Sequence, residues 1–187
     1  MTYVPRCLFV SGVLFALVCI GCASYPEVQL KDAQAAMDEV LKLQPETFAA
    51  GDWQDAKKIW DDAQALLSQQ KYGQAAPLLV TAKSRFAKVG EIVKTKREAI
   101  LKEVTQAQQD INVRVAGLRS DLAAARLSGS VRKGLDDCCQ QVQQQIEKLN
   151  AEIDQGELLK AQTTAKETLK LVYDGQLKME AAIKKHP

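Results

Sequence analysis

Histidine is almost missing from this chain of 187 residues. The only one, His186, stands next to the last residue. Chain ends usually fray, so no histidine is left inside a fold for a Ser-His-Asp triad, a Cys-His pair or a His-bearing metal site. A glycine-rich phosphate loop and zinc-type CxxC spacing are missing too. We therefore expect no catalytic residue, no metal and no cofactor, and we predict that the protein is not an enzyme.

An excess of charge of one sign is also missing. The 25 basic and 23 acidic side chains give a net charge of +2, which provides no electrostatic basis for binding nucleic acid. With 10 Gly, 5 Pro and 47% apolar residues, the composition excludes collagen-like repeats and intrinsic disorder. Acidic pairs occur at Asp61-Asp62 and Asp136-Asp137 and near Glu152 and Asp154, on helix phases that we expect to face solvent.

One apolar run stands apart from the rest. Residues 1–21 contain Arg6 but no acidic residue, and residues 7–21 are almost entirely apolar. Fifteen residues are too few to span a bilayer, which requires a helix of about 20. A basic start, a short apolar segment and small residues after it are typical of a secretory signal peptide. Ordinary cleavage of the signal and an uncleaved membrane anchor are the alternatives to the more specific interpretation that follows.

The tetrad Cys19-Ile20-Gly21-Cys22, followed by Ala23, resembles the lipobox of bacterial lipoproteins. The resemblance implies cleavage before Cys22 and acyl chains on this residue, which would hold the protein on a membrane. Because Ala23 rather than Asp follows Cys22, the sorting rule of enteric lipoproteins would favour the outer membrane. We thus expect a lipid-anchored protein of the bacterial cell envelope that faces the periplasm, with residues 1–21 as its signal peptide.

The remaining chain shows helical periodicity and no sustained strand-like alternation, so we predict an all-α fold. Turn signals divide it into helices at Gln44-Pro45, Gly51-Asp52, Lys71-Tyr72-Gly73, Ser128-Gly129-Ser130 and Gln155-Gly156. Pro77 conflicts with the third of these helices unless that helix begins near Gln74 or kinks at the proline. We expect a hairpin domain over residues 22–89 and a bundle of long, coiled-coil-like helices over residues 90–187.

An internal repeat supports the hairpin. Large residues alternate with alanine at steps of 3 and 4, and the pattern recurs after nineteen residues: Trp53, Ala56, Trp60, Ala63 and Leu67, then Tyr72, Ala75, Leu79, Ala82 and Phe86. Alanines that face large side chains let two helix axes approach closely, as in tetratricopeptide-like hairpins. The stretch from Ala33 to Val89 resembles the small tetratricopeptide-like domain of uncharacterised bacterial lipoproteins. This resemblance implies an envelope helical module without established catalytic residues.

Three aromatic residues of this repeat, Trp53, Tyr72 and Phe86, have two interpretations. Their helical spacing is typical of a buried core, whereas an exposed aromatic groove would indicate an interaction surface for a ligand. The degree to which their side chains are exposed separates the two interpretations.

Two apolar seams follow, and they require cover. The first includes Val93, Ile100, Val104, Ala107, Ile111, Val115, Leu118, Leu122 and Ala125, and the second Leu135, Cys139, Val142, Ile146, Leu149 and Ile153. Steps of 3 and 4 are typical of coiled-coil-like helices. A helix over residues 83–127 would be about 65 Å long. The long helices must therefore fold back on one another or bind a partner, and a second copy of this chain is one such partner.

The adjacent pair Cys138-Cys139 is unusual for an exported protein, because free thiols are uncommon in an oxidising compartment. Neighbours on a helix point about 100° apart, so we expect only Cys139 to fit the seam. Four states are open: reduced, half-buried thiols, a disulfide between chains, a vicinal disulfide, and a metal or redox site.

Together these features predict a non-enzymatic scaffold or adaptor, anchored to a membrane through Cys22 and bound to a protein partner in the envelope. The alternative is a helical module that binds a peptide or a peptidoglycan fragment.

Overall fold

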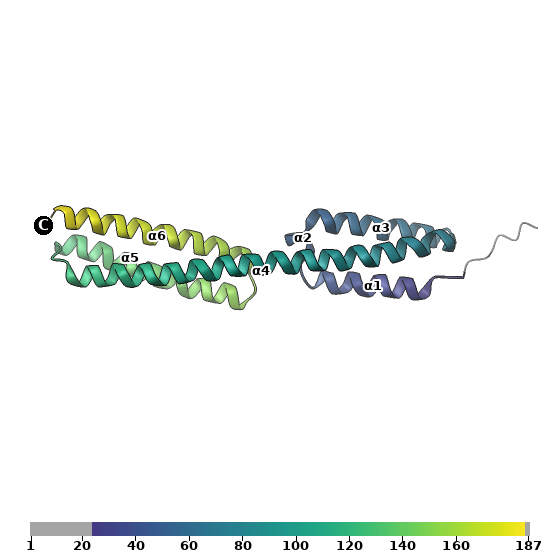
Figure 1. Ribbon diagram of the computed structural model, residues 1–187, viewed down its shortest axis with the longest axis horizontal. Coiled ribbons are helices and arrows are strands. Elements are labelled where there is room, and N and C mark those ends of the chain that lie inside the picture. Colours follow the sequence, from purple (N-terminus) through teal and green to yellow (C-terminus); the bar gives the residue numbers. More distant parts are fainter. Residues whose placement is uncertain (1–23, 186–187) are drawn as a thin grey trace, which may run out of the picture.

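The computed structural model describes residues 24–185, and all of its regular structure is helical. Figure 1 shows the six helices, which are α1 (Glu27–Leu41), α2 (Pro45–Phe48), α3 (Ala50–Ser68), α4 (Tyr72–Ala124), α5 (Gly129–Asp154) and α6 (Leu158–Lys185). The predicted all-α class is confirmed. Among these helices, none combines the length and the apolar character needed to cross a bilayer.

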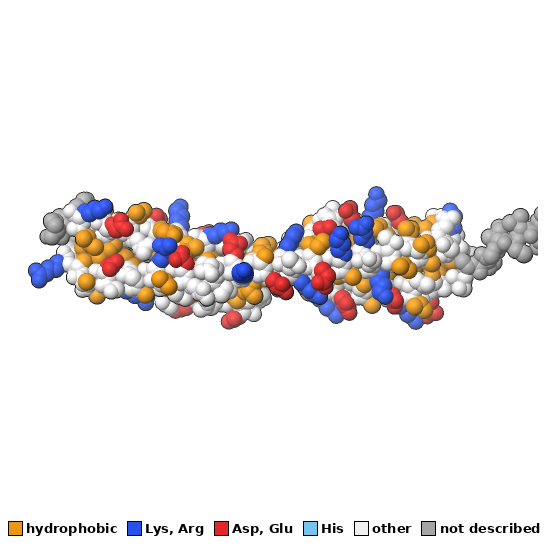
Figure 2. Space-filling view, viewed as in Figure 1, with side chains coloured by type: hydrophobic (Ala, Val, Ile, Leu, Met, Phe, Trp, Pro, Cys, Tyr) orange, Lys and Arg blue, Asp and Glu red, His pale blue; other side chains and the backbone are white. Residues whose placement is uncertain are grey.

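Helix α4 runs through both halves of the molecule. Its 53 residues correspond to about 80 Å at 1.5 Å per residue. Helices α1, α2 and α3 pack against its first half, and α5 and α6 cover its second half. The result is a rod with two thicker parts and a narrower waist between them, as the space-filling view shows (Figure 2).

Two bundles therefore share one helix, and their cores divide near residue 100. The core of the proximal bundle (residues 24–100) ends at Val93, and that of the distal bundle (residues 101–185) begins at Val104. Ile100 is partly buried and packs against both cores. The structure thus places the division inside α4 and about ten residues after the expected boundary at residue 89, where the helix continues without a break.

The proximal bundle contains the repeat seen in the sequence. Nine of the ten repeat residues are buried, and the tenth, Tyr72, is partly buried. The small alanines let α3 pack closely on α4 in an antiparallel hairpin, whereas few contacts join α1 to α3. Tetratricopeptide-like repeats are not shown, because the second helix of the hairpin runs on into the distal bundle and no further hairpin stacks on the first.

Two of the turns between antiparallel helices use the same hydrogen-bond pattern. After α3, the amides of Gln70 and Lys71 donate to the carbonyls of Leu67 and Leu66 at 2.9 Å each. Gln70 is left-handed there, with φ 58°. The connection therefore precedes the expected Lys71-Tyr72-Gly73 turn, and Gly73 lies inside α4.

After α5, Gly156 takes the left-handed position, with φ 72°, as its place in the Gln155-Gly156 turn signal predicts. The amides of Gly156 and Glu157 donate to the carbonyls of Ile153 and Glu152 at 3.0 and 2.8 Å. α4 begins at Tyr72, two residues before the start expected near Gln74, and includes Pro77 as its sixth residue.

The distal bundle buries both predicted seams within the chain. α6 lies against α4 and α5, so its own apolar stripe fills the space between them, with Leu158, Ala161, Ala165, Val172 and Met179 buried. The alternative of folding back thus covers most of the seam residues in the absence of any partner.

Gly175 in α6 lies where there is no room for a side chain. A Cβ atom at this position would lie 3.0 Å from Cys138 Sγ and 3.1 Å from Leu118 Cδ2. Gly117 in α4 is the matched control, since a Cβ there would meet nothing within 4 Å.

We expect Gly175→Leu to destabilise the protein by about 1–3 kcal/mol through overpacking. Gly117→Leu should be neutral or stabilising, because leucine is the better helix former and the site is open. Urea unfolding followed by circular dichroism measures both changes. Equal effects of the two substitutions would contradict the packing seen at Gly175.

Candidate functional site

The predicted lipidation site, Cys22, lies outside the described residues. Ser24 is the first residue described, and α1 begins at Glu27 at the end of the rod opposite the α4–α5 connection (Figure 1). The Tyr25 and Tyr72 rings meet edge to face at 5.4 Å, which holds the start of α1 beside the start of α4. The described chain therefore starts at the proximal end of the rod.

The three aromatic candidates lie in or beside the proximal core. Trp53 is 4% exposed and Phe86 is fully buried, with their ring centroids 5.5 Å apart. Tyr72 is partly buried at the end of the bundle, against Tyr25. Trp53 and Phe86 are thus packed as core residues, and they do not form an exposed groove that could receive a ligand.

Cys138 and Cys139 are both free cysteines, and both are buried. Cys139 packs with Leu118 and Leu122 of α4, as expected from the seam. Cys138, expected to point away from the seam, is buried too, because it faces α6 with its Sγ 3.7 Å from the carbonyl oxygen of Leu171. A helix that is covered on two sides, by α4 and by α6, buries two adjacent residues.

The buried position disfavours ionisation of both thiols. Burial is the main cause that raises the pKa of both Cys138 and Cys139, so the reactive thiolate is disfavoured. A smaller effect in the opposite direction comes from Arg119 beside Cys139. The two residues occupy consecutive positions of the regular helix α5. Consecutive positions of a regular helix do not suit a vicinal disulfide, which needs a strained, largely non-helical link.

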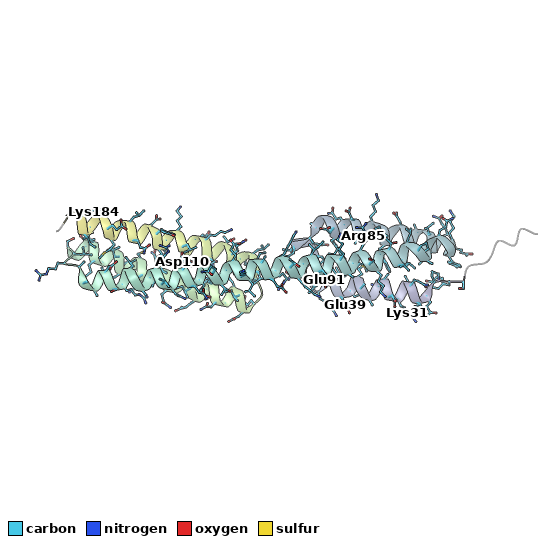
Figure 3. All side chains as sticks on the ribbon, viewed as in Figure 1. Lys31, Glu39, Arg85, Glu91, Asp110 and Lys184 are labelled. Carbon is cyan, nitrogen blue, oxygen red and sulfur yellow. The ribbon has the colours of Figure 1, made fainter. Side chains whose placement is uncertain are left out.

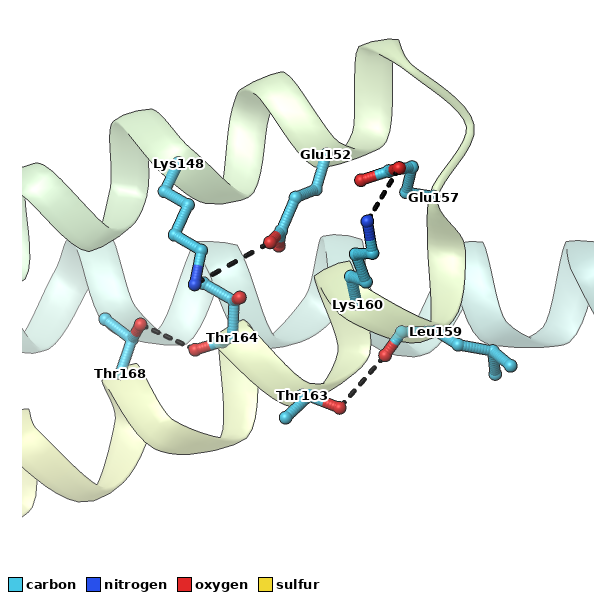
Figure 4. A network of polar contacts seen from close by, with 8 residues as sticks. All are labelled: Lys148, Glu152, Glu157, Leu159, Lys160, Thr163, Thr164 and Thr168. Atoms are coloured by element: carbon cyan, nitrogen blue, oxygen red, sulfur yellow. Dashed lines mark hydrogen bonds and ion pairs between the residues drawn. The ribbon is translucent and has the colours of Figure 1, made fainter.

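Glu152 departs from the surface position expected for it, since it is 7% exposed and lies between α5 and α6. Figure 4 shows its surroundings at the α5–α6 turn. Lys148 Nζ is 3.8 Å from Glu152 Oε1, while Glu152 Oε2 has no hydrogen-bond partner. Thr168 Oγ1 donates to the carbonyl of Thr164 at 2.6 Å on the facing helix. These groups form a polar layer in an otherwise apolar interface.

An open groove runs between α4 and α6 at the proximal end of the distal bundle. Its volume is about 710 Å³, and small residues such as Ala107 and Ala165 line it, along with Leu169. Its rim is bridged by Glu103 of α4, which accepts from Gln162 Nε2 at 2.6 Å and pairs with Lys166 Nζ at 3.4 Å.

Beyond this groove, polar and aromatic contacts continue to join α4 to α6. The Arg114 guanidinium lies 4.2 Å from the Tyr173 ring centroid. A hydrogen bond to Asp110, 2.8 Å from Arg114 Nε, is the main cause that raises the pKa of Arg114. This pair holds the cation in place over the ring, while Val113 beside it remains 73% exposed.

Two further hollows lie at the far end of the rod, one on each side of Leu127 in the α4–α5 connection. One of about 350 Å³ is lined by Leu127, Val131 and Ala182, with Lys178 at its edge. The other, of about 250 Å³, is lined by Ala125 and Ile183, with Arg126 and Asp121. No motif or periodicity in the sequence predicted a site at this end of the molecule.

Within residues 24–185, no group of three or more His, Cys, Asp or Glu side chains could hold a metal ion. The acidic pairs Asp61-Asp62 and Asp136-Asp137 are exposed. Comparison with known protein families, with curated proteins and with solved structures finds no match to this chain.

Proposed function

We propose that this protein is a lipid-anchored, non-enzymatic adaptor of the bacterial cell envelope, held on a membrane through Cys22 and extending into the periplasm to bind a partner protein. The observation that carries the proposal is the single continuous α4, which joins two separate bundles. A rod of about 80 Å places its distal end far from the point at which the chain is tethered. The lipobox-like sequence favours the outer membrane as the site of attachment.

One observation favours the second candidate function, a module that binds a peptide or a peptidoglycan fragment. The α4–α6 groove of about 710 Å³ combines an apolar floor with polar side chains at its rim. Ligand sites of proteins are typically concave and apolar with a few polar groups. The groove is lined by two adjacent helices, α4 and α6, and Glu103 bridges them at its rim.

The anchor is tested by labelling with a fatty acid analogue in a bacterial host. The unchanged chain should incorporate the label and sediment with membranes, because acyl chains on Cys22 add about 0.8 kcal/mol for each buried CH₂. Cys22→Ala should abolish both. The matched control is Cys138→Ala, which removes a buried thiol elsewhere and should keep the label. Label that persists in Cys22→Ala would exclude this residue as the anchor.

A further inference from the structure

The distal tip of the rod, formed by residues 121–135 and 178–184, is basic in a chain that is otherwise slightly acidic. It carries five basic side chains (Arg126, Arg132, Lys133, Lys178 and Lys184) and two acidic ones (Asp121 and Glu180). Elsewhere in residues 24–184 there are 18 basic and 21 acidic side chains. The basic side chains of the tip therefore outnumber its acidic ones, and the exposed pair Asp136-Asp137 follows directly in α5. Lys184 lies at the extremity of the tip (Figure 3).

These cations are available for a partner. Arg126, Lys133 and Lys178 are exposed, and no ion pair among the described residues joins them to an acidic side chain. Arg132 differs, because its Nη2 donates to the carbonyl of Ala125 at 3.0 Å and secures the α4–α5 connection. Steering and register at interfaces come mainly from such exposed complementary charges.

Apolar surface lies between the cations. Ile183 is 44% exposed at the edge of the smaller hollow, and Leu127 separates this hollow from the larger one. The two adjacent hollows together have a volume of roughly 600 Å³, which is room for a few apolar side chains. A partner with a flat surface would leave them unfilled. Hollows on both sides of one residue suit side chains that project from one face of a helix.

We propose that the distal tip is the docking surface for an acidic, amphipathic helical segment of a partner protein. Apolar side chains of the segment enter the hollows on both sides of Leu127, and its carboxylates face Arg126, Lys133 and Lys178. An anionic bilayer shares the charge complementarity but offers no side chains to fill the hollows, so the protein segment is the better fit. The proposal rests on the adaptor function for taking this end of the rod as the one that faces a partner.

The test uses the full chain and three fluorescein-labelled helical probes of roughly 16 residues, each with the same apolar face and an acidic, neutral or basic polar face. Fluorescence anisotropy gives the dissociation constants. The acidic probe should bind about ten-fold or more tightly than the basic probe, and its affinity should fall as salt rises. Co-sedimentation with phosphatidylglycerol vesicles measures binding to an anionic bilayer in parallel.

Charge-reversal variants locate the site. Arg126→Glu combined with Lys178→Glu should weaken the acidic probe about ten-fold or more. The matched control combines Lys58→Glu with Lys88→Glu, two exposed proximal positions without an ion pair among the described residues, and should leave the affinity within about two-fold. Circular dichroism verifies that both pairs remain helical.

Three results would overturn the proposal: an acidic probe that binds no better than the basic one, equal losses in both pairs of variants, or vesicle binding that requires the tip while the acidic probe fails to bind. None of these measurements requires an acyl chain. A failure here therefore leaves the outcome at Cys22 unchanged, and a failure of the anchor leaves the tip assay valid.

Discussion

Replacing Phe86 with Ala is expected to lower the free energy of unfolding by about 3–5 kcal/mol. Phe86 is fully buried at the centre of the proximal core, with its ring centroid 5.5 Å from that of Trp53 and 6.4 Å from that of Trp60. The substitution removes the ring that both tryptophans contact and leaves a cavity that three packed helices close only in part. The loss should be confined to the proximal bundle, since the distal core begins at Val104.

Tryptophan fluorescence provides a probe of this bundle alone, because the chain contains 2 Trp and both lie in α3. Guanidinium unfolding followed by fluorescence should shift to lower denaturant in Phe86→Ala, while circular dichroism at 222 nm retains a distal contribution at higher denaturant. Val80→Ala on the same helix is the control, since Val80 is 55% exposed and should change stability by less than about 0.5 kcal/mol. An equal shift in the two variants would contradict the central position of Phe86.

The second large effect is expected for Lys102→Pro at the waist of the rod. Proline removes the amide that donates to the carbonyl of Glu98 and clashes with that carbonyl, at a cost of about 3 kcal/mol or more. Lys102 is exposed and forms no ion pair among the described residues, so the backbone carries the whole effect. Since α4 is the main link between the bundles, the break should uncouple them and bend the rod.

Small-angle X-ray scattering should report a shorter maximum dimension or a broader distribution of distances for Lys102→Pro. The fluorescence and circular dichroism transitions, which report one bundle and both bundles respectively, should separate in denaturant. Lys102→Ala should leave scattering and unfolding unchanged, because alanine is an excellent helix former. Coincident transitions and unchanged scattering in the proline variant would show that contacts outside α4 hold the bundles together.

Much of the fold follows from local sequence rules. The turns near Gln44 and Gly156, the break at Ser128-Gly129-Ser130 and the alternation of alanine with large residues each correspond to a helix end or a buried face in the structure. Helix ends and buried faces of this kind depend on residues that are close in sequence, so the sequence of one chain is enough to predict them.

The errors arise where distant packing decides. Val89 and Gly90, which lie at the expected boundary between the two domains, are buried within an unbroken helix. Cys138 and Glu152 lie outside the α5 seam that periodicity predicts, and both are buried because α6 covers a second face of that helix. Periodicity along one helix does not reveal how many neighbours the helix will have.

The site was less predictable than the fold. Of the two interpretations open for Trp53, Tyr72 and Phe86, the structure has Trp53 and Phe86 in the core and Tyr72 partly buried. The distal tip gathers residues from two separate segments of the chain. Arg126 is far in sequence from Lys178 and Ile183, and only the antiparallel return of α6 brings these residues to the same end. Cys22 remains a prediction from its short motif.

Because α4 is continuous, it also fixes the rotation of the distal end of the rod relative to the proximal end about the helix axis. Each residue of an α-helix advances the chain by about 1.5 Å and turns it by about 100°. One residue inserted at the waist would thus swing the distal surfaces by more than a quarter turn relative to the proximal end, whereas seven would lengthen the rod by about 10 Å and restore nearly the original facing. The length of α4 at the waist therefore sets both the distance and the rotation between the two ends of the rod. An insertion or deletion keeps both ends facing their original directions only when its length is close to a whole number of helical turns.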